Sequence, residues 1–169
     1  MVTEVTEPQD SRLATRAPEN ANLGVFRPPL IYLASIVTGL AIHKARPQRL
    51  VVDAQAGLLG SSLTVVSILL FASAVKSFRT AGTPVQARKP TTALVRTGPY
   101  RFSRNPIYLA FSLFQLGIAI GVSSWWLIAT LAGAVAIIHF VVIPREEQYL
   151  ETRFGAQYLD YKAAVRRWF

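Results

Sequence analysis

Uncharged apolar stretches alternate with basic segments along most of this chain. Residues 54–75 form one such stretch, which is long enough for a spanning helix because crossing a membrane takes about 20 apolar residues. Residues 28–42 are shorter, so this segment either spans with help from the residues before it or lies partly in the membrane interface. Small residues in the longer stretch would let a neighbouring helix approach closely. They are Gly57, Gly60, Ser61 and Ser67.

The longest apolar stretch, residues 107–143, holds 37 residues without Lys, Arg, Asp or Glu. A single helix of that length would measure about 55 Å, far more than the roughly 30 Å hydrocarbon core of a bilayer. The stretch is therefore expected to fold back on itself at residues 121–124, where turn-forming residues lie. Trp125 and Trp126 follow the turn as an interfacial pair. We expect an all-α, polytopic membrane bundle of about four transmembrane helices, the last two forming a hairpin.

A C-terminal amphipathic helix is predicted to begin at Pro144, after the last apolar stretch. Apolar and aromatic residues recur there every three or four positions, which is the period of one helix face. Such a face can cover the open end of the bundle or lie in the lipid interface. The recurring residues are Leu150, Phe154, Tyr158, Tyr161, Val165 and Trp168.

The chain divides into three regions by this pattern. Residues 1–26 hold four acids, two arginines and no apolar stretch long enough to pack, so we expect a disordered tail. This tail has no recognisable targeting signal. Residues 27–79 carry the first two membrane segments, and residues 80–169 carry the hairpin with a polar segment on either side.

Composition favours a membrane protein over a nucleic-acid-binding domain. The 169 residues are 51% hydrophobic and only 16% charged, yet their net charge is +9. A nucleic-acid-binding domain would reach this charge with a polar composition, so no nucleic acid is expected as a partner. The chain has no cysteine, and its two histidines lie far apart without an acid-rich helix beside them. No metal site is therefore expected.

The placement of basic residues predicts the orientation in the membrane. Seven basic residues lie in the segment 76–104 and five more follow Ile143, whereas the hairpin tip has none. Both basic segments should therefore lie on one side, the cytoplasm, together with the N- and C-termini. This arrangement leaves three basic residues, in the segment 44–49, on the opposite side.

The first polar segment, residues 94–108, combines a turn, positive charge and aromatic rings. Its Gly98-Pro99 pair predicts the turn, and Asn105 is placed to cap a helix that begins at Pro106. Arginines beside a helix N-terminus could hold an anionic group, or could anchor the protein on acidic lipid. The segment contains Arg96, Arg101 and Arg104, interleaved with Tyr100 and Phe102.

The second polar segment begins with Glu146 and Glu147, directly after the last apolar stretch. Carboxylates at a helix start can interact with the helix dipole. They can also accept hydrogen bonds from the vicinal hydroxyls or the amine of a bound cofactor. Within the apolar stretch, His139 and Gln115 are either functional groups or polar residues hydrogen-bonded between helices.

Taken together, these segments resemble the isoprenylcysteine carboxyl methyltransferase and phospholipid methyltransferase superfamily of integral membrane enzymes. The resemblance covers roughly residues 80–169 and depends on the whole set of motifs in order. The motifs are Gly98-Pro99-Tyr100-Arg101, Arg104-Asn105-Pro106-x-Tyr108, Glu146-Glu147-x-x-Leu150, Phe154-Gly155-x-x-Tyr158-x-x-Tyr161 and Val165-Arg166-Arg167-Trp168.

The resemblance implies that residues 80–169 are a catalytic region that uses S-adenosylmethionine. It implies Arg104, Tyr108 and Glu147 as catalytic residues. The implied cofactor-binding residues are Tyr100, Arg101, Arg104, Asn105, Pro106, Tyr108, Arg145, Glu146 and Glu147. Two positions depart from the family pattern: Asn105 stands where better-known members have His, and Ala110 where they often have Gly.

The implied reaction is methyl transfer to a lipophilic or prenylated acceptor drawn from the membrane lipids, most simply the carboxylate of an isoprenylcysteine-like substrate. N-methylation of a phospholipid ethanolamine headgroup is the alternative. An NADPH-dependent sterol reductase shares related C-terminal motifs, although such proteins are usually much longer. A small non-catalytic transporter also fits four spans, although no predicted span contains Asp or Glu.

Overall fold

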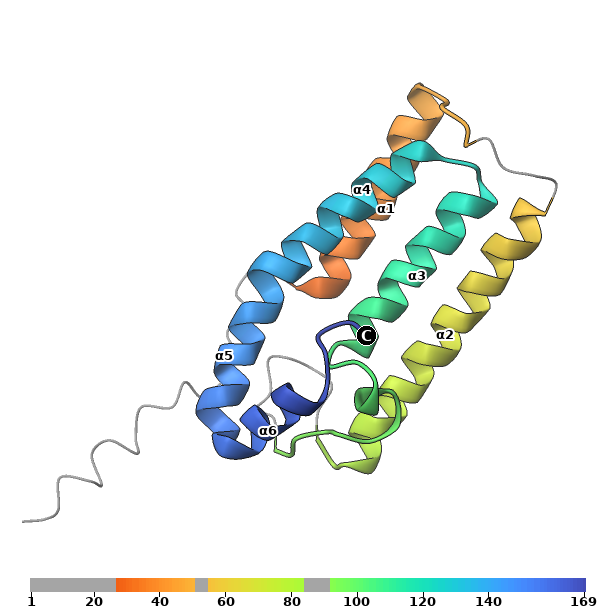
Figure 1. Cartoon of the computed structure of the whole chain (residues 1–169). Helices are drawn as coiled ribbons and strands as arrows, with labels where there is room; N and C mark the ends of the chain where they lie inside the picture. The colour runs from red at the N-terminus through yellow and green to blue at the C-terminus, as the bar shows by residue number, and fades with distance from the viewer. Residues whose placement is uncertain (1–26, 51–54, 84–91) are drawn as a thin grey trace, which may run out of the picture.

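The computed structural model describes residues 27–50, 55–83 and 92–169, and every regular element within these ranges is helical (Figure 1). The all-α prediction is therefore confirmed for this part of the chain, whereas the predicted tail 1–26 lies outside it. The elements are α1 (Pro28–Ala45), α2 (Ala56–Thr80), the 3-10 turn η3 (Gly98–Arg101), α3 (Pro106–Gly121), α4 (Trp125–Ile137), the π-helical η4 (Ile138–Val142), α5 (Ile143–Phe154) and α6 (Ala156–Ala164).

Helices α1, α2, α3 and α4 lie side by side in a bundle (Figure 1). Helix α3 lies between α2 on one side and the α1–α4 pair on the other. Gln115 of α3 makes polar contacts with both helices of that pair: its amide nitrogen lies 2.7 Å from Ser35 Oγ in α1 and 3.1 Å from the carbonyl of Leu127 in α4. Gln115 is fully buried and holds helices together, which is the structural alternative considered for it.

Helices α2 and α3 approach closely at a pair of glycines. A Cβ atom at Gly60 would lie 2.7 Å from the carbonyl oxygen of Gly117, which is closer than real Cβ contacts allow. Gly60 therefore lets α2 and α3 approach closely, as predicted for the small residues of this stretch. Gly57, by contrast, meets nothing within 4 Å, so it makes no comparable contact.

The hairpin turn forms where the turn-forming residues lie. Helix α3 ends at Gly121 and α4 begins at Trp125. Ser124 caps α4, because its hydroxyl accepts from the backbone N–H of Leu127. The segment after α1 pairs with this turn, since the N–H of Leu50 donates to the carbonyl of Ser123 at 3.0 Å.

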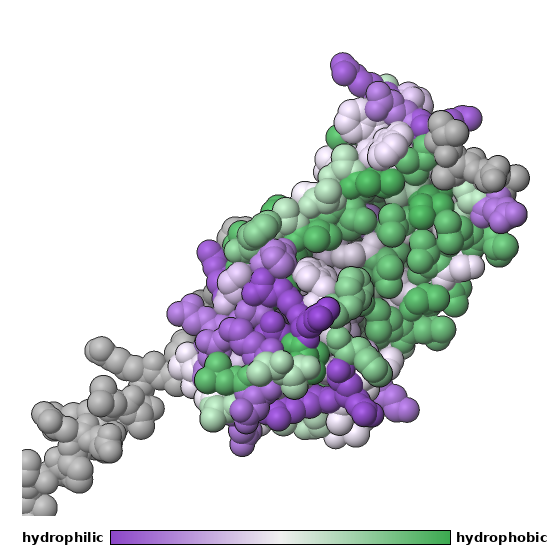
Figure 2. Space-filling view, viewed as in Figure 1, coloured by the Kyte–Doolittle hydropathy of each residue, from purple (hydrophilic) through white to green (hydrophobic). Residues whose placement is uncertain are grey.

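Within the described residues, two helices are long and apolar enough to cross a membrane: α2 and the continuous run Trp125–Phe154. Helix α3 is apolar but has only 16 residues, so the count of four spans stays a prediction. Large apolar side chains of α1 and α2 are exposed, as a lipid-facing surface requires. Figure 2 shows apolar residues over the middle of the bundle, a large group of hydrophilic residues at the lower end and a smaller group at the upper tip.

The helix that follows the hairpin does not restart at Pro144, so that predicted boundary is wrong. It runs for 30 residues and contains the π-helical segment η4, which ends at Val142, two residues before Pro144. Proline has no N–H to donate and its ring crowds the carbonyl four residues earlier, here that of Phe140. The wider π turn loosens the backbone at that carbonyl, so the helix passes the proline without ending.

The single C-terminal amphipathic helix predicted from the apolar stripe is also wrong. The chain breaks at Gly155, whose φ of +52° lies in a region that favours glycine, and α6 then ends at Ala164. Residues 165–169 are not helical and form what we call the C-terminal strap. The apolar stripe correctly predicts that Tyr158 and Tyr161 are buried, but it does not predict the interruption of the helix at Gly155.

Candidate functional site

The two polar segments meet at one end of the bundle, where α5, α6 and the C-terminal strap lie against the loop that precedes α3 (Figure 1). Backbone and side-chain groups of this loop bind the strap. The N–H of Arg104 donates to the carbonyl of Arg166 at 3.0 Å, and the Asn105 amide nitrogen donates to the carbonyl of Arg167 at 3.0 Å. Asn105 therefore holds the strap and does not cap α3 with its side chain, in contrast to the sequence-based expectation.

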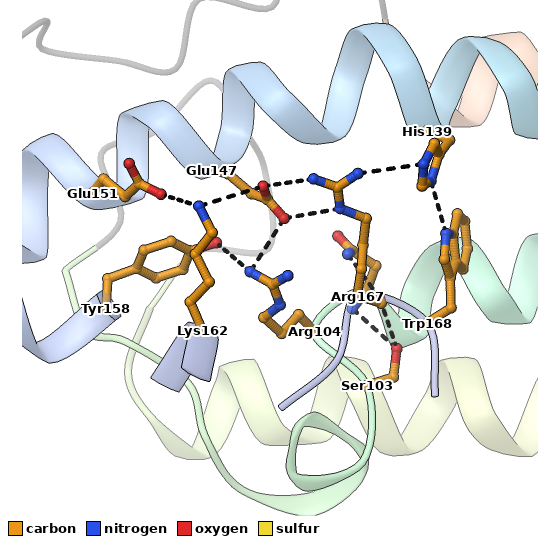
Figure 3. Close-up of polar contacts among 10 residues, drawn as sticks. Ser103, Arg104, His139, Glu147, Glu151, Tyr158, Lys162, Arg167 and Trp168 are labelled. Atoms are coloured by element: carbon orange, nitrogen blue, oxygen red, sulfur yellow. Dashed lines mark hydrogen bonds and ion pairs between the residues drawn. The ribbon is translucent and has the colours of Figure 1, made fainter. Parts of the chain in front are cut away.

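Glu147 lies at the centre of a cluster of ion pairs (Figure 3). Arg167 binds it with two nitrogens, since Nε donates to Oε1 at 3.1 Å and Nη2 to Oε2 at 2.8 Å. Arg104 Nη1 lies 3.2 Å from Oε1, and Lys162 Nζ lies 3.9 Å from Oε2. The Glu147 and Arg104 side chains are each only 10% exposed, so this pairing takes place largely out of water.

These cations come from three separate segments of the chain. Arg104 precedes α3, Lys162 lies in α6 and Arg167 lies in the C-terminal strap. Lys162 also pairs with Glu151 of α5. The hydrogen bonds to Glu147 raise the pKa of the Arg167 guanidinium, which therefore stays charged. Glu147 thus joins the loop, α6 and the strap to α5.

Tyr158 adds a neutral hydroxyl beside this cluster. Arg104 Nη1 donates to the Tyr158 hydroxyl at 3.4 Å, and burial raises the pKa of Tyr158 to about 12, so the phenol keeps its proton. The Arg104 Nε atom is buried and has no hydrogen-bond partner among the described residues. A buried N–H without a partner costs about 1–3 kcal/mol, so Arg104 Nε is a polar group that the described residues leave unsatisfied.

Tyr108 and Glu146 form a second polar pair. The Tyr108 hydroxyl donates to Glu146 Oε1 at 2.5 Å, joining the first turn of α3 to α5. Tyr108 is buried, and its backbone carbonyl accepts from the hydroxyl of Tyr32 in α1. This pair brings a phenol and a carboxylate together where the helices meet the polar end of the molecule.

Tyr100 connects the loop that precedes α3 to Phe78 of α2 and Tyr161 of α6. It is buried, its ring packs against Phe78 with centroids 5.3 Å apart, and its carbonyl accepts from the Tyr161 hydroxyl at 2.8 Å. Arg96 lies over the Tyr161 ring, with the guanidinium carbon 5.7 Å from the ring centroid. Burial raises the pKa of both Tyr100 and Tyr161, so both hydroxyls stay protonated.

The structure thus brings most of the sequence-predicted site residues to one place. Arg104, Asn105, Tyr108, Glu146 and Glu147 are joined by the bonds above. Pro106 starts α3 and is buried beneath them, and Tyr100 positions the loop. Arg101 and Arg145 differ from these residues, because both are exposed to solvent.

Four residues of this site are not among the catalytic or cofactor-binding residues that the sequence predicts. They are His139, Lys162, Arg167 and Trp168. The Val165-Arg166-Arg167-Trp168 motif is a signal for the strap, but it does not tell which of two adjacent arginines faces Glu147. His139 contacts the strap, since Trp168 Nε1 donates to its Nδ1 at 3.0 Å.

The chain is similar to known proteins over part of its length. The family model for phospholipid methyltransferase matches residues 56–157. Protein-S-isoprenylcysteine O-methyltransferases A and B of Arabidopsis thaliana are each 35% identical over 74 residues, which is 43% of this chain and 36% of theirs. An uncharacterized protein of Haemophilus influenzae is 48% identical over 48 residues, 25% of this chain and 76% of that protein. No solved structure matches.

The match spans only about a third of the length of the two Arabidopsis proteins. The family model, in contrast, covers well over half of the chain and includes α2, the hairpin and both acidic site residues. The resemblance noted from the sequence motifs is therefore confirmed: the chain belongs to the phospholipid methyltransferase family of integral membrane proteins.

Proposed function

We propose that this chain transfers a methyl group from S-adenosylmethionine to a lipophilic acceptor, and that the acceptor group is the carboxylate of an isoprenylcysteine-like molecule. The observation that carries the proposal is the polar site built from Arg104, Tyr108, Glu146 and Glu147 within the family match. The names of the two Arabidopsis relatives support a prenylcysteine acceptor over other lipids.

The polar groups of the site suit S-adenosylmethionine, which carries ribose hydroxyls, an amine and a carboxylate. The buried Arg104 Nε has no partner among the described residues and would donate to an oxygen of this molecule. Glu146 would accept from its hydroxyls or amine. The sulfonium supplies a methyl group that is already activated, so the protein needs to orient the two reactants and exclude water.

The two acids have different parts in this proposal. Glu147 is surrounded by Arg104, Lys162 and Arg167, so few of its lone pairs remain for a ligand. It acts by holding the cations in place. Glu146 has a neutral partner, the Tyr108 hydroxyl, and keeps more of its capacity to accept hydrogen bonds. Roles for the exposed Arg101 and Arg145 stay predictions.

The nature of the acceptor decides whether a base is needed. A carboxylate acceptor attacks as it stands, and the basic surroundings would attract it. The alternative acceptor, a phospholipid amine, has to lose a proton first, and the Tyr108–Glu146 pair is the candidate to take it. The matched family, which is described as phospholipid methyltransferase, is the observation that keeps this second acceptor class in consideration.

We also propose that the polar end of the molecule faces the cytoplasm. This orientation follows the excess of basic residues in the segments 76–104 and 145–167. Water-soluble S-adenosylmethionine would enter from that side, whereas a lipophilic acceptor would enter through the bilayer.

The test is an incubation of the purified protein in detergent with methyl-labelled S-adenosylmethionine and either N-acetyl-S-farnesylcysteine or extracted membrane lipids. We expect base-labile label on the farnesylcysteine, because a methyl ester hydrolyses in base. Label on the phospholipid headgroup would favour the alternative acceptor. Tight binding of NADPH without affinity for S-adenosylhomocysteine would contradict methyl transfer and support a reductase.

A further inference from the structure

His139 faces hydrogen-bond donors on both of its ring nitrogens (Figure 3). Its Nδ1 lies 3.0 Å from Trp168 Nε1, and its Nε2 lies 3.4 Å from Arg167 Nη1. The indole N–H and the guanidinium can only donate. A neutral imidazole carries one N–H and one acceptor nitrogen, so it can accept from only one of these two neighbours.

The distances show which contact is the stronger hydrogen bond. The Trp168 contact is the shorter one, at 3.0 Å against 3.4 Å for Arg167, so the indole N–H is assigned as the donor and Nδ1 as its acceptor. Nδ1 therefore accepts, and the proton of His139 lies on Nε2. With this tautomer, the remaining contact brings two donors, His139 Nε2–H and Arg167 Nη1–H, to 3.4 Å from each other.

The Nη1 atom of Arg167 is not used in binding Glu147. Its Nε and Nη2 are both engaged by Glu147, which leaves Nη1 on the His139 side. Two nitrogens 3.4 Å apart can each reach one shared oxygen at about 2.9 Å, which is an ordinary hydrogen-bond length. The surrounding cluster holds three cations, Arg104, Lys162 and Arg167, against the carboxylates of Glu147 and Glu151, and so favours an added anion.

We infer that His139 and Arg167 form a carboxylate-binding pair, with Trp168 as the positioning residue that keeps the His139 proton on Nε2. The inference rests on the proposed methyl transfer and deepens it, because two reactants carry a carboxylate: the prenylcysteine acceptor and S-adenosylmethionine itself. In either case one carboxylate oxygen accepts from His139 Nε2 and Arg167 Nη1 together.

The experiment compares two pairs of probes on the full chain in detergent. One pair is N-acetyl-S-farnesylcysteine and its neutral amide, and the other is S-adenosylhomocysteine and its decarboxylated analogue. His139→Phe removes the donor and should weaken the carboxylate member of one pair by about tenfold or more, as expected for a lost charge-assisted bond. The carboxylate-free member should bind as it does to the original protein.

The pair affected identifies the source of the carboxylate. Selective loss for farnesylcysteine assigns the pair to the acceptor, and selective loss for S-adenosylhomocysteine assigns it to the cofactor. His139→Gln keeps an N–H donor near the Nε2 position and should restore most of the affinity. Trp168→Phe keeps the ring but frees the tautomer, and should give an intermediate loss with the same selectivity.

Arg166→Ala is the matched control, because Arg166 is the neighbouring strap arginine and its side chain is exposed. It should leave all four affinities unchanged. Equal loss for both members of each pair, or no loss in His139→Phe, would overturn the carboxylate assignment and leave an ordered water as the only occupant. If the original protein binds neither S-adenosylhomocysteine nor its analogue, the proposed function itself fails, which is a different result.

Discussion

Single residues in this site have parts that their position in the sequence does not reveal. Glu146 and Glu147 are adjacent, yet one meets a neutral phenol and the other meets three cations. The difference arises because successive residues of a helix point about 100° apart, so each faces a different neighbour. The double-acid motif predicts that acids lie at the site, but only the packing of the strap and α6 separates their chemistry.

Glu147→Gln should destabilise the polar end of the molecule. The substitution keeps the size of the side chain but leaves Arg104 and Arg167 without their counter-charge, and breaking a buried pair costs up to about 3–5 kcal/mol. Because Arg167 is partly exposed, we expect about 2 kcal/mol, together with loss of S-adenosylhomocysteine binding. Thermal unfolding in detergent and a binding titration measure the two effects.

Glu151→Gln is the control for that experiment. Glu151 pairs with Lys162 in the same cluster, but its side chain is 36% exposed, so its loss should cost less than about 1 kcal/mol. If both substitutions lowered stability equally, Glu147 would not be the centre of the cluster.

Tyr108→Phe should impair methyl transfer more than it impairs folding. The ring still fills its buried place, and only the hydroxyl bond to Glu146 is lost, which costs about 1–2 kcal/mol. Tyr32→Phe removes another buried hydroxyl, one that contacts Ser112 and the Tyr108 carbonyl outside the acidic pair. A similar loss of stability with normal activity is expected for Tyr32→Phe, measured by unfolding and by labelled methyl transfer. Equal activity in the two variants would contradict the role of the Tyr108 hydroxyl.

At the scale of elements, the sequence predicts the helices better than their ends. Charge-free length predicts the hairpin, and turn-forming residues place it at residues 121–124, because both signals are local. The continuity of α4, η4 and α5 is not predicted, since Pro144 normally ends a helix and only the π turn lets it continue. The sequence does not predict the strap for another reason. The strap carbonyls accept hydrogen bonds from the Arg104 N–H and the Asn105 side chain, which lie about sixty residues earlier in the chain.

Gly60→Ala tests the close packing of α2 on α3. The added methyl group would lie 2.7 Å from the Gly117 carbonyl, so the helices have to separate, and overpacking of this kind costs about 1–3 kcal/mol. Gly57→Ala lies one turn earlier in open space and should be neutral or stabilising by up to about 1 kcal/mol, as alanine is in a helix. Unfolding temperatures of the two variants in detergent should therefore move in opposite directions. An equal fall of the unfolding temperature in both variants would contradict the stabilising role of the Gly60–Gly117 contact.

At the scale of the whole molecule, the polar site and the hairpin tip lie at opposite ends of the bundle (Figure 1). The charge difference between these ends predicts that they face opposite sides of the membrane. In the proposed reaction, this arrangement would let a water-soluble methyl donor and a lipid acceptor reach one site from different phases.

The proposed orientation can be measured because the chain has no cysteine. Asp160→Cys places a thiol on the exposed surface of α6, and Val122→Cys places one at the hairpin tip. In sealed, right-side-out vesicles, an impermeant maleimide should label position 122 but reach position 160 only after the membrane is opened. Detergent treatment, which exposes both sites, is the control, and the reverse labelling pattern would place the polar end outside.

The π turn at Ile138–Val142 has a consequence for comparing this chain with its relatives. A π turn holds one residue more than an α-helical turn of similar rise, so it is equivalent to an insertion within a continuous helix. A relative without the turn would have one residue fewer between the segments that correspond to Trp125–Ile137 and to Glu146 onward. An ungapped alignment that fits the first segment would therefore be shifted by one residue in the second. Homologous positions on the two sides of His139 are therefore found only when a single-residue gap is allowed inside the helix.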